Sequence, residues 1–242
     1  MKTHMNRLTR LSMALLTAAA AAGASAATNL PDGEYRYGQL SGGMFSRLQA
    51  LDHTIDLSTG SLAVVMPGTS SLTNQTSWAL GIGRQWHEDK PKDGSEPRYW
   101  RLEAEYWGGT AKRTLFESRM LKVPLSDSVK MSGIHVMALS RISRGETSRL
   151  WMGAGLGYMN VSVPDANAAS PNCACLGGAS GSGWSGRIKT LLERDLGEET
   201  TGYVEVSYTT VPSVRTGAGV VPSVRTTFDS PVSVHLGLRR AF

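Results

Sequence analysis

The sequence predicts an all-β fold, a closed antiparallel up-and-down transmembrane β-barrel of about eight strands, preceded by a cleavable signal peptide. Three observations support it. The N-terminus is basic, then briefly apolar, and ends in small residues. The rest of the chain alternates apolar and polar residues with a period of two in about eight segments, and the connections between these segments are alternately long and short.

Residues 1–26 have the order of a secretory signal peptide. Three basic residues and no acid are followed by a short apolar stretch, which ends at Ala24-Ser25-Ala26. The apolar part is too short to cross a bilayer as a helix. We therefore expect cleavage after Ala26, and a barrel domain that occupies residues 27–242.

Composition narrows the function classes. Removing the signal takes away three basic residues and no acid, so the formal charge falls from +5 to +2 and no basic stripe remains. This argues against a nucleic-acid partner. No run of 18 apolar residues is available for a transmembrane helix, and a membrane protein without one must be a closed barrel, because every backbone polar group in lipid needs a partner.

Two-residue alternation identifies the strands. It is clearest at 99–107, where Trp100 and Leu102 fall on one face and Arg101 and Glu103 fall on the other. Others are clear at 78–86, 150–158, 203–208 and 232–242, and weaker at 34–40, 129–140 and 184–193.

The connections sort by length. Those expected to be long are 41–76, 109–128, 160–182 and 210–230, and those expected to be short are 88–97, 143–148 and 194–201. With both chain ends on the periplasmic side, every long connection is a surface-exposed loop outside the cell. A soluble β-sandwich has no reason to alternate its loops in this way.

The charged faces are expected to point into the barrel, because carboxylates and guanidinium groups are costly in hydrocarbon. A barrel of about eight strands is just wide enough to be filled by side chains. The predicted lumen charge network consists of Arg101, Glu103, Glu105, Arg187, Lys189, Glu205, His235 and Arg239. We expect ion pairs rather than an open pore, with Gly153, Gly155 and Gly157 leaving room for long side chains across the lumen.

The final residues, VSVHLGLRRAF, resemble the C-terminal strand of outer-membrane barrels, which alternates apolar residues and ends in an aromatic. The chain from about Gly33 to Phe242 is similar to the eight-stranded group of the OmpA transmembrane domain, OmpX and the opacity proteins. The resemblance implies that Leu236, Leu238 and Phe242 form the signal read by the barrel-assembly machinery. Arg240 departs from the pattern, and at the periplasmic rim its side chain could reach the headgroups.

Two cysteines, Cys173 and Cys175, lie in the third long loop. Because the protein is exported, we expect the two thiols to be oxidised. A C-x-C pair can close a small disulfide or bind a soft metal. A metal site needs further ligands, and no histidine is close in sequence. A local disulfide is favoured, and no metal or cofactor is predicted.

The fourth long loop repeats a hexapeptide, VPSVRT, at 211–216 and 221–226. Two copies are too few for a solenoid, so a tolerated duplication in an exposed loop is the simpler interpretation. As a hypothesis, Arg215 and Arg225 meet anionic sugars or phosphates of lipopolysaccharide. The apolar segment 60–68 is either a β extension of the barrel or a contact patch, and the sequence does not separate the two.

A lipid-modifying enzyme is the competing class, since some barrels of this size deacylate or acylate lipid A. The deacylases carry a His-x-Ser pair, which is absent here after His53, His87, His135 and His235. Ser233 and His235 share a face in the reverse order, but no acid in the sequence is placed to orient the histidine. His235 is expected to be a hydrogen-bonding residue of the lumen.

The sequence therefore favours a monomeric, non-catalytic integral protein of the bacterial outer membrane, which contributes to envelope integrity or to surface interaction and adhesion. Outer-membrane lipid and lipopolysaccharide are its expected partners. A narrow, porin-like diffusion channel is the first alternative and a lipid A-modifying enzyme the second.

Overall fold

The structure is a computed structural model. It describes residues 34–45, 50–56, 65–88, 97–119, 122–145, 148–167, 174–176, 178–215 and 223–242. All regular structure in these segments is β-strand. Within them, no helix has the length and apolar character needed to cross a membrane.

Fourteen strands occur in the described residues. They are β1 (Tyr35–Phe45), β2 (Ala50–Asp56), β3 (Val65–His87), β4 (Tyr99–Ser118), β5 (Lys122–Pro124), β6 (Ser128–Arg144), β7 (Ser148–Val163), β8 (Ala166–Asn167), β9 (Ala174–Leu176), β10 (Ala179–Asp195), β11 (Thr200–Thr209), β12 (Val214–Arg215), β13 (Ser223–Phe228) and β14 (Val232–Ala241).

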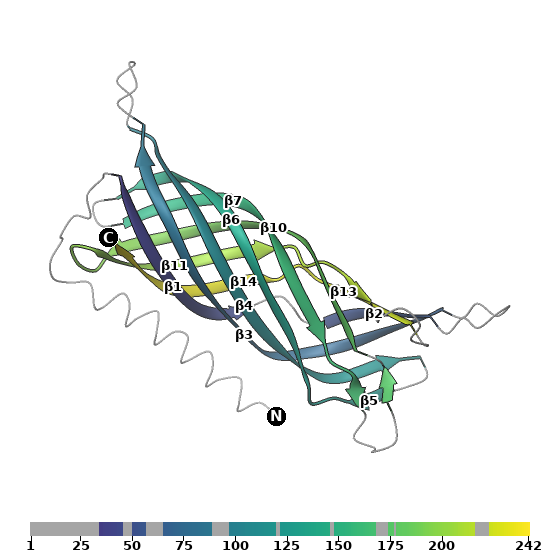
Figure 1. Ribbon diagram of the computed structural model, residues 1–242. Coiled ribbons are helices and arrows are strands. Elements are labelled where there is room, and N and C mark those ends of the chain that lie inside the picture. Colours follow the sequence, from purple (N-terminus) through teal and green to yellow (C-terminus); the bar gives the residue numbers. More distant parts are fainter. Residues whose placement is uncertain are drawn as a thin grey trace, which may run out of the picture.

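Eight of these strands form a closed ring in which every neighbour is antiparallel. The order is β1, β3, β4, β6, β7, β10, β11 and β14, and the pairing of β14 with β1 closes the ring. In that last ladder Tyr37 lies opposite Ala241, and Phe45 lies opposite Ser233. Figure 1 shows the strands wrapped obliquely around a common axis. The predicted fold class is confirmed, and each predicted segment overlaps one strand of the ring.

The four long connections are not simple loops, and that expectation was wrong. Strand β3 begins at Val65, β4 continues to Ser118, and β2, β12 and β13 form within the expected loops. These strands pair in the order β3, β2, β13, β12, β10, so at this end of the barrel they replace β1, β14 and β11 (Figure 1). We call this part the external extension; its described residues fall within 50–56, 65–76, 110–132, 160–182 and 211–228.

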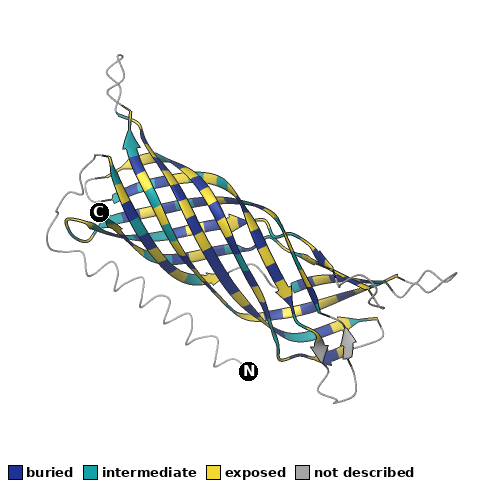
Figure 2. Cartoon of the chain, in the orientation of Figure 1, coloured by how far each residue is buried: buried dark blue, intermediate teal, exposed yellow. Residues whose placement is uncertain are grey.

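Polarity reverses between the ring and the external extension. In the ring, large apolar side chains face outward, among them Leu156, which is 69% exposed, and Ile82, which is 65% exposed, while charged side chains are buried inside. In the external extension Val129 and Val161 are buried, whereas Lys130 is exposed. Figure 2 shows the alternation of buried and exposed residues along each strand. An apolar exterior suits hydrocarbon and a polar exterior suits water, so the reversal marks the edge of the bilayer.

Aromatic side chains mark both edges of the apolar band. Near the external extension, outward rings form two contacts, Trp78 with Tyr106 at 5.4 Å and Tyr158 with Trp184 at 5.9 Å between ring centroids. Toward the other end Trp100 faces outward. Such girdles flank the lipid-facing band of outer-membrane barrels, where amphipathic rings sit at headgroup level.

The glycines of β7 allow a close approach between strands. A Cβ at Gly155 would lie 2.1 Å from the carbonyl oxygen of Val136, and one at Gly157 would lie 2.1 Å from that of Ile134. The lumen side chains of Met137 and His135 on β6 lie over these positions. The glycines therefore make room for the neighbouring strand β6 and its inward side chains.

Some predictions fall outside the described residues. The signal peptide at 1–26 and Cys173 lie there, and of Cys175 only the backbone, in β9, is described. The disulfide therefore stays a prediction. The apolar segment 60–68 is described from Val65, where it forms the start of β3 and so extends the barrel.

Candidate functional site: the charged barrel interior

The barrel brings the predicted lumen charges together from four strands. β4 supplies Arg101, Glu103 and Glu105, β10 supplies Arg187 and Lys189, β11 supplies Glu205, and β14 supplies His235 and Arg239. Each of these side chains is 2% exposed or less. Because successive side chains of a strand alternate between its two faces, residues two apart project into the same lumen.

Lys189 lies at the centre of the cluster. Its Nζ is 2.5 Å from a carboxylate oxygen of Glu103, 3.2 Å from one of Glu105 and 3.4 Å from one of Glu205. The guanidinium of Arg187 bridges the last two acids, at 2.6 Å to Glu105 and 2.7 Å to Glu205. One side of the ring, at β10, is thereby tied to β4 and to β11 through charged contacts.

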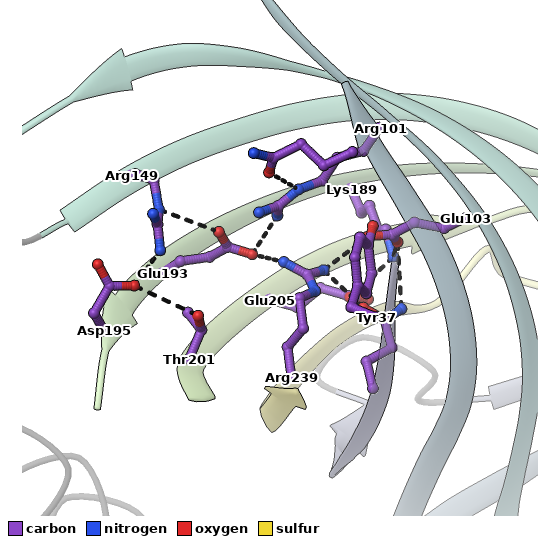
Figure 3. Close-up of polar contacts among 12 residues, drawn as sticks. Tyr37, Arg101, Glu103, Arg149, Lys189, Glu193, Asp195, Thr201, Glu205 and Arg239 are labelled. Carbon is purple, nitrogen blue, oxygen red and sulfur yellow. Dashed lines mark hydrogen bonds and ion pairs between the residues drawn. The ribbon is translucent and has the colours of Figure 1, made fainter. Parts of the chain in front are cut away.

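A second group of ion pairs extends the network toward the end of the barrel away from the external extension (Figure 3). Arg239 pairs with Glu103 at 2.7 Å and also with Glu193. Arg101 donates to Glu193 at 2.5 Å, and Arg149 pairs with Glu193 at 3.8 Å and with Asp195. Seven strands of the ring, β1, β3, β4, β7, β10, β11 and β14, contribute polar groups to this connected cluster.

Glu193 was missed by the sequence reasoning, although a signal for it was present. It lies two and four residues beyond Leu191 and Lys189, on the inward face of a predicted strand, and it is fully buried. Arg149 was missed as well, because it falls at the edge of the predicted segment 150–158, where a one-residue shift of the boundary removes it.

Aromatic and amide side chains complete the contacts of the charged groups. The Tyr37 hydroxyl donates to Glu103 at 2.7 Å, and Gln39 accepts from Arg239 at 2.7 Å. The guanidinium carbon of Arg101 lies 3.7 Å from the ring centroid of Trp151, and that of Arg239 lies 4.3 Å from that of Tyr37. Stacking of this kind stabilises a desolvated guanidinium group.

The central cluster is balanced in formal charge. Four cations and four carboxylates contact one another, namely Arg101, Arg187, Lys189, Arg239, Glu103, Glu105, Glu193 and Glu205. A single buried charge without a partner costs several kcal/mol, about 3–5 kcal/mol when one member of a pair is removed. The balance therefore allows a charged interior to remain dry, and the paired side chains occupy the lumen.

An apolar layer lies above the charged cluster, toward the external extension. Its members are buried and pack against one another, and they include Trp107, Met131, Met159, Val161 and Val214. The T-shaped contact of Phe45 with Trp107, with ring centroids 5.5 Å apart, belongs to the same layer. An ionic layer and an apolar layer of side chains thus follow one another along the lumen, and a further buried apolar cluster, which includes Trp151 and Tyr203, lies within the ring.

The lumen histidines hydrogen-bond to hydroxyl groups. His235 lies 2.6 Å from Ser77 and 3.2 Å from Ser41, whereas Ser233 contacts Ser207 at 2.9 Å. The Ser233–His235 pair considered from the sequence is therefore not formed. Among the residues that the structure describes, no group of three His, Cys, Asp or Glu side chains could hold a metal ion.

Comparison with solved structures identifies the architecture. The outer membrane protein OprG from Pseudomonas aeruginosa superposes with a TM-score of 0.53 at 15% sequence identity, over 87% of this chain and 96% of OprG. The fold is that of a small outer-membrane β-barrel. Two further matches are the outer membrane protein AlkL, with a TM-score of 0.49 at 15% identity over 90% and 95% of the two chains, and Neisserial surface protein A, with 0.42 at 14% over 87% and 100%.

At 15% identity the likeness to OprG establishes the fold and nothing finer. No known protein family and no curated protein sequence matches the chain. The closer resemblance to OmpA, OmpX and the opacity proteins stays a prediction. With its apolar exterior and charged interior, the small outer-membrane barrel is a protein of the bacterial outer membrane.

The C-terminal strand closes this barrel with its apolar face outward. Leu238 is 55% exposed and Phe242 is 78% exposed, and Leu236 is partly exposed on the same face. Arg240, which departed from the pattern, is exposed and lies 3.4 Å from Glu199. Its charge thus has a partner on the turn between β10 and β11.

Proposed function

We propose that the protein is a non-catalytic integral barrel with a closed interior, which contributes to envelope integrity or surface interaction through its external extension. The filling of the lumen carries the proposal. Ion pairs join β4, β10, β11 and β14 across the interior, and the apolar layer above them contains Trp107 and Met131. Both layers project into the space that a porin-like channel would have to keep open for water.

The roles of the individual residues form part of the same proposal. Seven of the eight predicted lumen residues, with Glu193, hold the barrel together by ion pairs, and His235 contributes hydrogen bonds to Ser77 and Ser41. Leu236, Leu238 and Phe242 provide the surface read by the barrel-assembly machinery, and the barrel acts as a monomer in contact with outer-membrane lipid and lipopolysaccharide.

Bilayer recording tests the closed interior. The purified full chain is added to planar bilayers and compared with the Glu103→Ala and Arg101→Ala variants, with the surface variant Glu117→Ala as a matched control. If the interior is closed, the wild-type protein gives no discrete conductance steps. Loss of a lumen charge is then expected to raise the conductance or to destabilise the fold. Regular steps from the wild-type protein would favour the channel instead.

Lipid analysis tests the absence of catalysis. Lipid A is extracted from cells that overexpress the protein and from cells that carry an empty vector, and the acyl chains are compared by mass spectrometry. A non-catalytic barrel leaves the pattern unchanged. A change in acyl-chain number that is lost on Ser77→Ala or His235→Ala would instead favour the lipid-modifying enzyme, since these two residues are in contact.

A further inference from the structure

A row of outward polar residues crosses five strands at the boundary between the ring and the external extension. The register places Thr110 opposite Lys130, Lys130 opposite Ser162, Ser162 opposite Ser180, and Ser180 opposite Arg215. All five side chains are exposed. We call these five residues, with Lys112, the polar band; Lys112 is exposed on the same face of β4, two residues beyond Thr110.

The cations of the polar band lack acidic partners. Among the described residues, neither Lys112, Lys130 nor Arg215 forms an ion pair, in contrast to Lys122, which lies 3.4 Å from Glu117 farther along the extension. Asp165 is an acid three residues beyond Ser162, but its carboxylate accepts a hydrogen bond from the backbone N–H of Gly178 and forms no ion pair with these three cations. The band therefore presents uncompensated positive charge on the outside of the barrel.

The band continues into a pair of like charges that lie opposite each other on neighbouring strands. Arg215 on β12 lies opposite Arg225 on β13, and both are exposed. Like charges directly opposite on neighbouring strands destabilise a ladder, and a bound anion relieves that repulsion. Asp52 and Asp56 on β2 flank Arg225 diagonally, because they pair with Thr227 and Ser223. These two acids offset the charge of Arg225, so the positive electrostatic potential is strongest around Arg215 and the two lysines.

The polar band borders the aromatic girdle. Four residues from the band along β6, β7 and β10 lie the outward apolar side chains of Ile134, Tyr158 and Trp184. The Tyr158 hydroxyl and Ser182 hydroxyl, 2.8 Å apart, mark the transition. A hollow of about 550 Å³ lies at this transition. Its lining includes Trp78 of the girdle and Lys130 and Ser180 of the polar band, and it contains no acid.

The geometry points to a headgroup site on this face of the barrel for a phosphorylated glycolipid of the outer leaflet. Its phosphates lie on Lys112, Lys130 and Arg215, its sugar hydroxyls on Ser162 and Ser180, and its acyl chains run over the girdle. Strands lie about 4.8 Å apart, so three intervals from Lys130 to Arg215 span roughly 14 Å, a length that suits a disaccharide with a phosphate at each end. This inference rests on the outer-membrane location and deepens the proposed surface interaction.

Native mass spectrometry of the folded full chain in non-ionic detergent tests the site. The probe is bis-phosphorylated lipid A, titrated against the wild type and against the Lys130→Gln/Arg215→Gln double variant. A juxtamembrane cation contributes about fivefold to binding an anionic lipid, so the double variant is expected to bind about 25-fold more weakly. Dephosphorylated lipid A is expected to bind the wild type about as weakly.

A matched double variant controls for general charge. Arg84→Gln/Arg240→Gln removes two exposed cations near the opposite end of the barrel, where they pair with Glu34 and Glu199, and it is expected to retain wild-type binding. An equal loss in this control, or unchanged binding by the first double variant, overturns the site. Equal binding of the phosphorylated disaccharide without acyl chains also overturns it, in favour of a soluble anionic glycan.

Two further readouts keep this test separate from the proposed function. Gel mobility with and without boiling shows that each variant is folded. Bilayer recording of the double variant is expected to match the wild type, because Lys130 and Arg215 lie outside the lumen. Conductance of the wild type would refute the closed interior while leaving the headgroup site open to its own test.

Discussion

The ammonium group of Lys189 lies 2.5 Å from a carboxylate oxygen of Glu103, and neither side chain is exposed to solvent. The two residues belong to β10 and β4, which are not neighbours in the ring, so the contact crosses the lumen. Ion pairs of this kind stabilise the barrel mainly by compensating each other's desolvation, and removal of one partner exposes the full cost.

Replacing Glu103 by Gln is expected to lower the free energy of unfolding by about 3–5 kcal/mol, because Lys189 and Arg239 lose a shared acid. The measurement is the urea concentration at the midpoint of unfolding in lipid vesicles, with gel mobility used to distinguish folded from unfolded protein. Glu117→Gln removes an exposed acid and is expected to change stability by less than about 1 kcal/mol. Equal stability and equal conductance of wild type and the Glu103 variant would mean that the inward face has been misassigned.

Substituting Gly155 by Val is expected to prevent barrel assembly, because even a Cβ there would lie 2.1 Å from the backbone oxygen of Val136. The adjacent substitution Ala154→Val adds similar volume on the exposed, outward face and is expected to be tolerated. The fraction of protein with heat-modifiable mobility in outer-membrane fractions measures assembly. Normal assembly of the Gly155 variant would contradict the close approach of β6 and β7.

Introducing arginine at Leu156 is expected to cost about 2–4 kcal/mol, because this outward residue lies within the apolar band. Ser162→Arg lies on the same face of the same strand, beyond the aromatic girdle, and is expected to be nearly neutral. Refolding titrations in vesicles give both values. Equal costs at the two positions would show that the bilayer edge does not lie between them.

The external extension is expected to loosen as the pH falls from about 6.5 to about 4. His53 on β2 contacts Ser70 at 2.7 Å and Thr226 at 2.9 Å, and burial, reinforced by the charge of Arg113, lowers its pKa to about 4. Arg113 itself pairs with Asp127 at 2.5 Å. The unfolded extension, in which the histidine pKa is near 6.5, therefore takes up a proton that the folded form excludes, so stability is lost as pH falls.

Hydrogen exchange of β2 and β13 at pH 7.5 and pH 5.0, corrected for intrinsic rates, measures this effect. Wild-type protection is expected to fall at the lower pH, while the amides of β7 within the ring keep theirs. His53→Gln cannot titrate and is expected to lose the pH dependence. A pH dependence of the same size in that variant would assign the effect to another group.

The membrane-spanning ring could be predicted from the sequence because lipid imposes a strict rule on its strands. Outward residues must be apolar, and two-residue alternation at 99–107 shows both faces at once. The inward charges followed from the same rule. Their partners did not, since a pairing such as that of Arg101 with Glu193 depends on the register of several strands and on which rotamers meet across the lumen.

The external extension could not be predicted because its strands follow the opposite rule. There, small or polar outward residues alternate with buried ones such as Val129 and Val161, and the signal of a half-buried strand in water is weak beside that of its neighbours. The pairing of β12 with β13 depends on contacts with β10 and β2, which are distant in sequence. One copy of the repeated hexapeptide contributes to β12 and the other to β13. This structural role is not visible when the repeat is considered only as a binding motif.

The native tryptophans distinguish the two faces of the strands, one of which meets lipid while the other meets the interior. Single-tryptophan variants that keep either Trp184, which is 77% exposed, or Trp151, which is fully buried beside Arg101, are refolded into vesicles of brominated lipid. This arrangement of the two faces predicts strong quenching of Trp184 fluorescence and little quenching of Trp151 fluorescence. Equal quenching of the two, or stronger quenching of Trp151, would contradict it.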